Sequence, residues 1–273
     1  MLKDITIGQY YPTGSAIHKL DPRVKLFGTI LYIVTLFIAR NPVVYILAAA
    51  FLFTCIGIAK VPLKYILRGL KTIMIILAFS LIFNIFFTEG RVLVQFWKIK
   101  ITYEGIIQAI YMGIRLILLI IGSSLMTLTT TPNDLTDGME KGLRFLTVIK
   151  IPVHEIAMMM SIALRFIPIL MEETDKIMKA QTARGASFDE GNFFKRIKAL
   201  IPILVPLFIS AIRRAYDLAT AMEARCYRGG NGRTKMKPLK YSKKDGLAYI
   251  ILFAYLGLII AARILWNKFV QVG

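Results

Sequence analysis

Cysteine, histidine and acidic residues are scarce in this sequence, and each scarcity excludes a class of chemistry. The 273 residues include two cysteines, with Cys55 in an apolar run and Cys226 in a basic segment. Two thiols so placed predict neither a disulfide framework nor a cysteine metal cluster. The two histidines, His18 and His154, also lack the spacing of metal ligands. We therefore expect this chain to bind no metal ion.

Sequence signatures of catalysis and nucleotide binding are missing as well. No Gly-x-x-x-x-Gly-Lys-Ser/Thr segment is present, so ATP binding through a P-loop is excluded, and no Gly-x-Ser-x-Gly motif marks a nucleophile. A secondary transporter usually buries Asp, Glu or His within its spans, and the long apolar runs here contain none beyond their first turns. Arg115 is a charged residue inside the fourth of these runs, where it lines a functional seam, pairs with a backbone carbonyl or extends its charge to the membrane interface. These absences predict a chain that is not an enzyme.

What the sequence has in abundance is apolar residues and positive charge. Hydrophobic residues make up 56% of the chain and charged residues 19%, which leaves too little polar surface for a soluble domain of this length. The sequence therefore predicts an integral membrane protein. The net charge of +19 then indicates cytoplasmic loops held against anionic lipid rather than nucleic-acid binding.

Five apolar runs of 16 to 25 residues are candidates for membrane-spanning helices, which need about 20 mostly apolar residues. They cover residues 24–39, 43–59, 66–87, 106–130 and 247–262. The segment before the first run is basic, and residues 132–246 carry 20 of the 35 Lys and Arg residues. Because loops rich in Lys and Arg usually lie on the cytoplasmic side of a membrane, we expect the N-terminus and residues 132–246 to lie in the cytoplasm. The predicted fold is an all-α membrane protein with three parts: 1–131, 132–246 and 247–273.

The basic region 132–246 is also rich in apolar residues and is expected to contain long helices. Turn signals predict a short helix from residue 132 to about 147 and two long ones, over 153–184 and 193–227. Their apolar parts contain prolines at 168, 202 and 206 and are short for spans. We favour helices that lie along or just beneath the membrane face. Additional membrane spans are the alternative interpretation.

The two long helices are expected to end in matching segments, Ala183-Arg184-Gly185 and Ala224-Arg225-Cys226. An arginine in a last helical turn interacts favourably with the helix dipole and needs no partner for that purpose. Two matching ends, each with alanines one and four residues before the arginine, favour a second role. A planar, permanently charged guanidinium flanked by small residues suits a carboxylate in a groove of another protein.

These segments carry a resemblance to a known family. The stretch Ala163-Leu164-Arg165-Phe166-Ile167-Pro168, followed by the two alanine-arginine ends, resembles the transmembrane coupling component of energy-coupling factor transporters, the EcfT/CbiQ family. The resemblance covers the whole chain. It implies that long coupling helices cross beneath the membrane and that Arg184 and Arg225 dock into paired ATPase subunits. The departure is Cys226, where the motif often has glycine; this change bears on how the helix ends and leaves the arginine in place.

The resemblance implies an importer of vitamins or metal ions in the bacterial cell membrane. Its partners would be two ABC-type ATPases, identical or different, a separate substrate-binding membrane subunit and lipid. ATP and Mg²⁺ would bind the ATPases, and this chain would bind no cofactor. An ordinary ABC permease or a free-standing secondary transporter is the alternative function.

The apolar halves of the two long helices are the expected contact with the substrate-binding subunit. Three consecutive methionines in the first helix would give a soft, adaptable surface for varied partners, although core packing is the alternative for them. The residues predicted for this contact are Met158, Met159, Ile162, Leu204 and Phe208.

Overall fold

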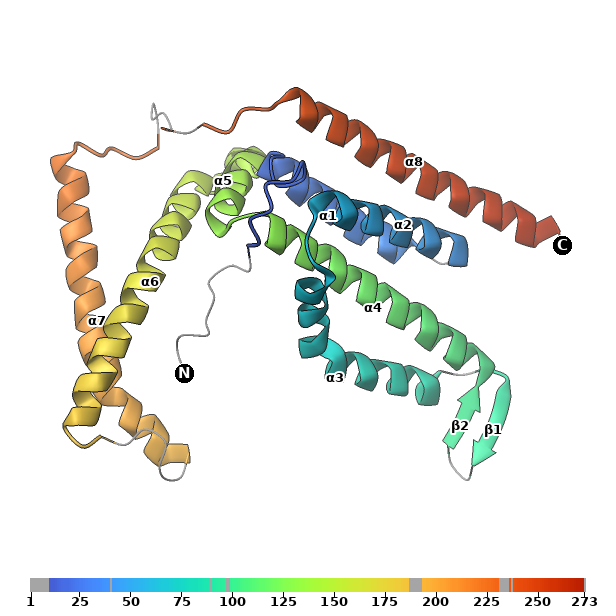
Figure 1. The fold of residues 1–273 in the computed structure, drawn as a ribbon, viewed down its shortest axis with the longest axis horizontal. Helices are drawn as coiled ribbons and strands as arrows, with labels where there is room; N and C mark the ends of the chain where they lie inside the picture. Colours follow the sequence, from blue (N-terminus) through green and yellow to red (C-terminus); the bar gives the residue numbers. More distant parts are fainter. Residues whose placement is uncertain are drawn as a thin grey trace. The chain divides into compact units, whose positions relative to one another are not determined.

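The computed structural model of the chain describes residues 10–39, 41–88, 90–96, 99–186, 193–230, 236 and 238–272 (Figure 1). Most of these residues are helical, and the chain divides into two compact units. The bundle unit consists of Gly8–Gly138 and Leu239–Gly273, and the α6–α7 unit contains Met139–Pro238. The predicted division into 1–131, 132–246 and 247–273 follows the membrane spans rather than internal contacts, so it stays a prediction.

The bundle unit contains a helix at each of the five predicted spans. They are α1 (Pro22–Ile38), α2 (Pro42–Ala59), α3 (Leu63–Phe87), α4 (Tyr103–Thr129) and α8 (Lys243–Val272). Proline at the first position of α1 and α2 fixes a helical φ where no backbone donor is needed. Lys60 ends α2 in a left-handed conformation, with φ of 53°.

Length and composition make several of these helices suitable for crossing a membrane. Among the described residues, α2, α4, α6 (Val153–Ala183) and the Lys243–Trp266 part of α8 qualify. The two halves of α3, Leu63–Lys71 and Ile73–Phe87, add a fifth if this helix, bent by 59°, is one span. The all-α membrane class, with four to five candidate spans, is thus confirmed, but among the described residues the candidates include α6 and do not include α1, the helix at the first predicted span. α6 has the length and composition that the extra-span interpretation requires.

A β-hairpin between α3 and α4 was not predicted. Strands β1 (Val92–Phe96) and β2 (Ile99–Thr102) pair antiparallel, with Phe96 opposite Ile99. β-branched and polar residues alternate in β2, which is typical of a strand, but the strand is too short to form a long apolar run.

The core of the bundle unit lies between α1, α2, α3, α4 and α8. Buried side chains from all five elements or their flanks meet there, including Leu36, Val44, Ile66, Leu118 and Ile259.

Arg115 of α4 lies beside this core and is paired. Its Nη2 donates to the carbonyl of Ala39 at 3.1 Å, and its Nε donates to the Tyr45 hydroxyl at 3.0 Å. Because Ala39 is the C-cap of α1, the positive charge lies at the negative end of that helix. The interpretation of Arg115 as a partner of a backbone carbonyl is confirmed.

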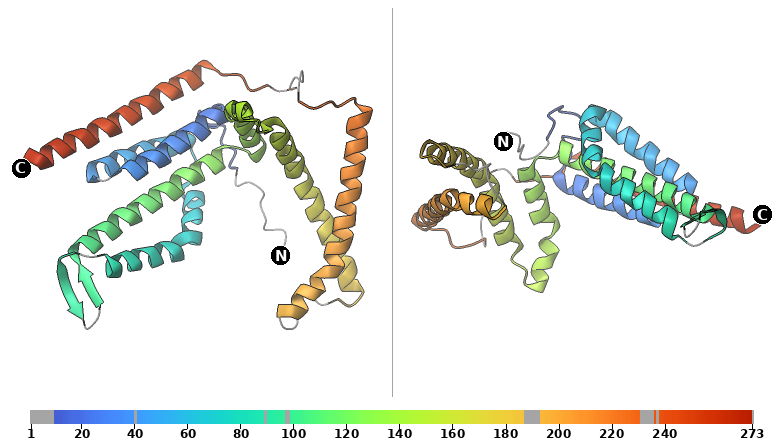
Figure 2. Two further views of the ribbon diagram at one scale, coloured as in Figure 1. Left: turned by 180° about the vertical axis from the view of Figure 1, so that it is seen from behind. Right: turned by 90° about the horizontal axis from the view of Figure 1, so that it is seen from below.

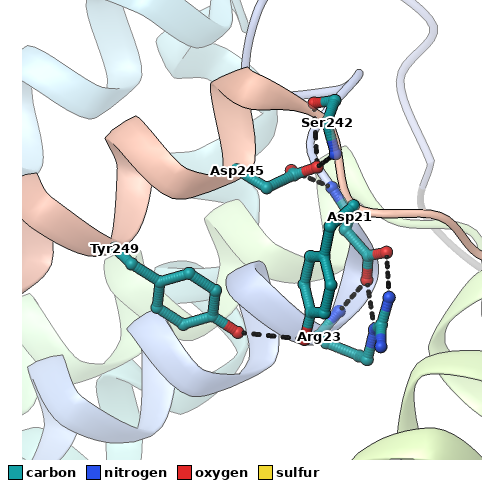
Figure 3. A network of polar contacts seen from close by, with 6 residues as sticks. Asp21, Arg23, Ser242, Asp245 and Tyr249 are labelled. Atoms are coloured by element: carbon teal, nitrogen blue, oxygen red, sulfur yellow. Dashed lines mark hydrogen bonds and ion pairs between the residues drawn. The ribbon is translucent and has the colours of Figure 1, made fainter.

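The first turns of α1 and α8 meet in a polar network (Figure 3). Asp21 caps α1, since its Oδ1 accepts the Arg23 N–H at 2.9 Å. Asp245 closes a capping box on α8 by accepting the Ser242 N–H at 2.7 Å and its hydroxyl at 2.9 Å. The other carboxylate oxygen of Asp245 accepts the Asp21 N–H at 2.8 Å. Asp245, which is only 2% exposed, therefore joins α1, near the start of the chain, to α8, near its end.

Residues 21–23 also contact both chain segments that connect the bundle unit to the rest of the chain. Gly138, in α5 (Pro132–Gly142), lies so close to Pro22 that an added Cβ would be 2.9 Å from the proline ring. On the returning segment, the Arg23 guanidinium stacks 3.7 Å above the centre of the Tyr241 ring. The points where the chain leaves and re-enters this unit are thus held by the same three residues.

The α6–α7 unit consists of a 3₁₀ helix (Arg144–Ile149), α6 and α7 (Phe193–Ala224). At the start of α6, His154 Nδ1 lies 2.9 Å from a carboxylate oxygen of Glu140. The ribbon of α7 changes direction in its first half (Figures 1 and 2). Pro202 and Pro206 lie in that part of the helix, where each removes a backbone donor and bends the axis.

Candidate docking site at the ends of α6 and α7

Helices α6 and α7 pack against each other and run in opposite directions (Figure 2). Glu173 of α6 joins them by accepting the Ser210 hydroxyl at 2.5 Å and Arg214 Nη2 at 2.9 Å. Nearer the end of α6, Gln181 Nε2 donates to the Pro202 carbonyl at 3.4 Å. The end of α6 therefore lies beside the first part of α7, so the two C-terminal ends are at opposite ends of the pair.

α6 ends in a Schellman motif that leaves Arg184 as the capping residue. Gly185 has a φ of 89° and donates its N–H to the Thr182 carbonyl at 2.9 Å. The next N–H, of Ala186, donates to the Gln181 carbonyl at 3.0 Å. This pair of hydrogen bonds satisfies carbonyls that the helix end would otherwise leave unpaired.

α7 ends in the same motif around Arg225. Cys226 has a φ of 56° and donates its N–H to the Glu223 carbonyl at 2.8 Å, while Tyr227 donates to the Met222 carbonyl at 3.0 Å. Cys226 thus takes the position and conformation of Gly185, so the departure from glycine does not change how the helix ends. Its Cβ makes the left-handed conformation costly, by roughly 1–2 kcal/mol for a residue other than glycine.

Cys226→Gly is accordingly expected to stabilise the protein by about 1 kcal/mol, because glycine adopts this φ without strain. Thermal unfolding of the detergent-solubilised chain would measure the gain. Cys226→Ala is the matched control, since it removes the thiol and keeps the Cβ. Equal shifts for the two variants would show that the thiol, rather than the backbone conformation, decides the effect.

All six predicted docking residues are exposed at these two ends: Ala183, Arg184, Gly185, Ala224, Arg225 and Cys226. Within the described ranges neither Arg184 nor Arg225 forms an ion pair, whereas Arg214 is paired with Glu173. Small neighbours and an exposed arginine leave each helix end accessible to a partner. Their role in docking stays a prediction.

The residues predicted to contact a substrate-binding subunit fall into two groups. Met159, Leu204 and Phe208 are exposed, by 58%, 57% and 67% respectively. Core packing within this chain is therefore excluded for Met159. Met158 and Ile162 instead line a cleft of about 570 Å³ between the first half of α6 and the end of α7.

Comparison with known proteins identifies the family. Residues 13–236 match the family model described as cobalt transport protein, CbiQ, which covers most of the chain and both arginine ends. The chain belongs to the CbiQ family. The resemblance inferred from the two alanine-arginine segments is thereby confirmed.

Several curated relatives of this chain share one functional name. The energy-coupling factor transporter transmembrane protein EcfT of Clostridium kluyveri is 54% identical over 98% of this chain and 100% of its own length. The protein of the same name from Lactococcus lactis is 45% identical over 98% of this chain and 99% of its own length, and that from Bacillus subtilis is 45% identical over 96% and 100%.

One feature of this CbiQ-family chain was missed by sequence reasoning. The cleft at the end of α7 is lined by three arginines, Arg165, Arg225 and Arg228. Arg225 and Arg228 are three residues apart, but only the tertiary structure brings Arg165 beside them. The positive charge at the α7 end is thus larger than the motif alone indicates.

Proposed function

We propose that this CbiQ-family chain is the transmembrane component of an energy-coupling factor importer, and that α6 and α7 are its coupling helices. One observation supports the proposal most directly: two helix ends with the same capping motif each present an exposed arginine with no ion-pair partner in the described part of the chain. The name shared by its relatives agrees with this role.

Each arginine end would dock into one of two ABC-type ATPase subunits. The guanidinium of Arg184 or Arg225 can give a carboxylate two parallel charge-assisted hydrogen bonds, and the neighbouring alanines let the helix end enter a groove. ATP and Mg²⁺ would bind the ATPases, and closure of the ATPases would bring the two helix ends toward each other. This chain contributes no group to ATP hydrolysis in that scheme.

The motion would reach a substrate-binding membrane subunit through the apolar parts of α6 and α7. Glu173 holds the two helices together through Ser210 and Arg214, so displacement of one end moves the other helix as well. The exposed side chains of Met159, Leu204 and Phe208 offer an apolar surface for that subunit, which would carry a vitamin or a metal ion.

We place the chain in the bacterial cell membrane, with its N-terminus and the α6–α7 unit in the cytoplasm. The basic segment before α1 and the concentration of Lys and Arg between α4 and α8 support this orientation. The ATPases and their nucleotide would then be on the same side as Arg184 and Arg225.

Reconstitution into proteoliposomes tests the proposal against both alternatives. Uptake of labelled cobalt and of a set of labelled water-soluble vitamins would be measured for the chain alone, with the ATPases, and with ATPases plus the substrate-binding subunit. We expect ATP-dependent uptake only in the complete mixture. Uptake by the chain alone would indicate a secondary transporter, and uptake without the substrate-binding subunit would indicate an ordinary permease; either result overturns the proposal.

A further inference from the structure

The bundle unit contains an apolar cavity of about 490 Å³ at one end of its helices. Its walls come from the turn before α1, the first turns of α1 and α8, and the last turns of α2 and α4. This is the end where the Asp21–Asp245 network lies. The walls include Val24, Leu52, Ile58, Leu125, Leu247 and Ile251.

The size and lining of this cavity suit a hydrocarbon chain. An engineered apolar cavity of about 150 Å³ holds one benzene molecule. A cavity about three times as large has room for roughly the carbon atoms of one lipid acyl chain. Its walls are almost entirely aliphatic and aromatic, so water would find few partners there.

Lys25 supplies the charge at the mouth of the cavity. This half-buried side chain lines the apolar cavity and also an adjoining polar cavity of about 280 Å³. Its Nζ donates to the carbonyls of His18, at 3.0 Å, and Thr129, at 2.8 Å. Carbonyls accept hydrogen bonds but carry no full negative charge, and the nearest opposite charges are the carboxylates of Asp134, Asp21 and Asp245.

The carboxylates that line the adjoining polar cavity are engaged elsewhere. Asp21 pairs with Arg23, Asp245 accepts from Ser242 and from the backbone of Asp21, and Asp134 accepts the Thr131 hydroxyl at 2.6 Å. Within the part of the chain that the structure describes, Lys25 forms no ion pair. A second lysine, Lys244, lines the apolar cavity from the first turn of α8.

We propose that this cavity binds one anionic phospholipid, with an acyl chain between α1, α2, α4 and α8 and the phosphate at Lys25 and Lys244. An uncharged hydrocarbon would fill the cavity and leave Lys25 without an ion-pair partner in the described part of the chain, while a small soluble anion would leave the apolar walls empty. A phospholipid of net negative charge satisfies both requirements. The site lies at the basic end of the bundle unit, where anionic lipids of the cytoplasmic leaflet are attracted. It does not depend on the coupling role of α6 and α7.

Native mass spectrometry of the full chain in detergent tests the site, with phosphatidylglycerol or phosphatidylcholine of the same acyl chains added. We expect retention of one phosphatidylglycerol per chain, at least fivefold tighter than phosphatidylcholine, since each basic group near a lipid headgroup contributes about that factor. Equal retention of the two lipids would overturn the proposal.

Two pairs of variants separate the headgroup from the acyl chain. Lys244→Gln removes a charge at the mouth, with Lys243→Gln, one residue earlier and outside the lining, as its control. Ala248→Phe fills the cavity, with the exposed Ala254 changed to Phe as its control. We expect both lining variants to bind phosphatidylglycerol at least fivefold more weakly than their controls. Unchanged binding of phosphatidylglycerol to Ala248→Phe would overturn the placement of the acyl chain. Unchanged binding to Lys244→Gln would overturn the placement of the phosphate.

Discussion

Arg225→Glu and Arg184→Glu are each expected to release an ATPase subunit and to abolish ATP-driven uptake in the intact complex. Removing one partner of a buried interfacial charge pair costs about 2 to 5 kcal/mol, which corresponds to roughly 30-fold to several-thousand-fold weaker binding. Glutamate adds repulsion where the groove is acidic. Capture of the ATPases on the tagged chain and uptake in proteoliposomes would measure the two effects.

Matched variants place this effect at the helix ends. Lys179→Glu and Arg213→Glu change exposed basic residues of the same two helices, away from the caps, and should keep ATPase binding. Arg225→Lys keeps the charge but loses the planar pair of donors, so we expect an intermediate loss. Normal ATPase binding and normal uptake in both glutamate variants would contradict the coupling role.

Asp245→Ala is expected to destabilise the bundle unit by about 3 kcal/mol. The substitution removes the acceptor for the buried N–H of Asp21 and for the part-buried N–H of Ser242, and a buried donor left unpaired costs about 1–3 kcal/mol. For a chain of this size the midpoint of thermal unfolding should fall by roughly 10 °C. Thermal unfolding of the purified chain in detergent would measure the shift.

Two comparisons make this result specific to the network in Figure 3. Asp245→Asn keeps one oxygen acceptor and should lose less stability than Asp245→Ala. Asp217→Ala removes an exposed carboxylate from α7 and should change the midpoint by little. If Asp245→Ala unfolds at the same temperature as Asp217→Ala, the carboxylate does not hold α1 and α8 together.

Sequence reasoning found the helices because their signals are local. Apolar runs bounded by Pro42, Lys60 or Gly185 specify where a helix begins or ends without reference to the rest of the chain. The hairpin of β1 and β2 was missed because its strands are too short to stand out beside membrane spans. α3 is bent although it contains no proline, so its sequence does not predict the bend.

Contacts between distant residues could not be predicted in the same way. The matching arginine ends were visible because each is a three-residue pattern, but their placement at opposite ends of a helix pair depends on the contact of Glu173 with Ser210 and Arg214. The hydrogen bond from Asp21 to Asp245 joins residues 224 positions apart, and no periodicity or motif links them. Likewise, the unpaired charge of Lys25 becomes apparent only when its two carbonyl acceptors are known.

The contacts of residues 21–23 bear on how this protein can be recombined. Pro22 touches Gly138, where the chain leaves the bundle unit, and Arg23 stacks on Tyr241, just after the chain returns. The segment between Gly138 and Tyr241 is thus an insertion in the bundle unit whose two ends both lie beside residues 22–23. Such an arrangement tolerates domain insertion and exchange. Chimaeras between relatives with junctions at these two positions should therefore fold, so that partner choice can evolve, or be engineered, separately from the membrane bundle.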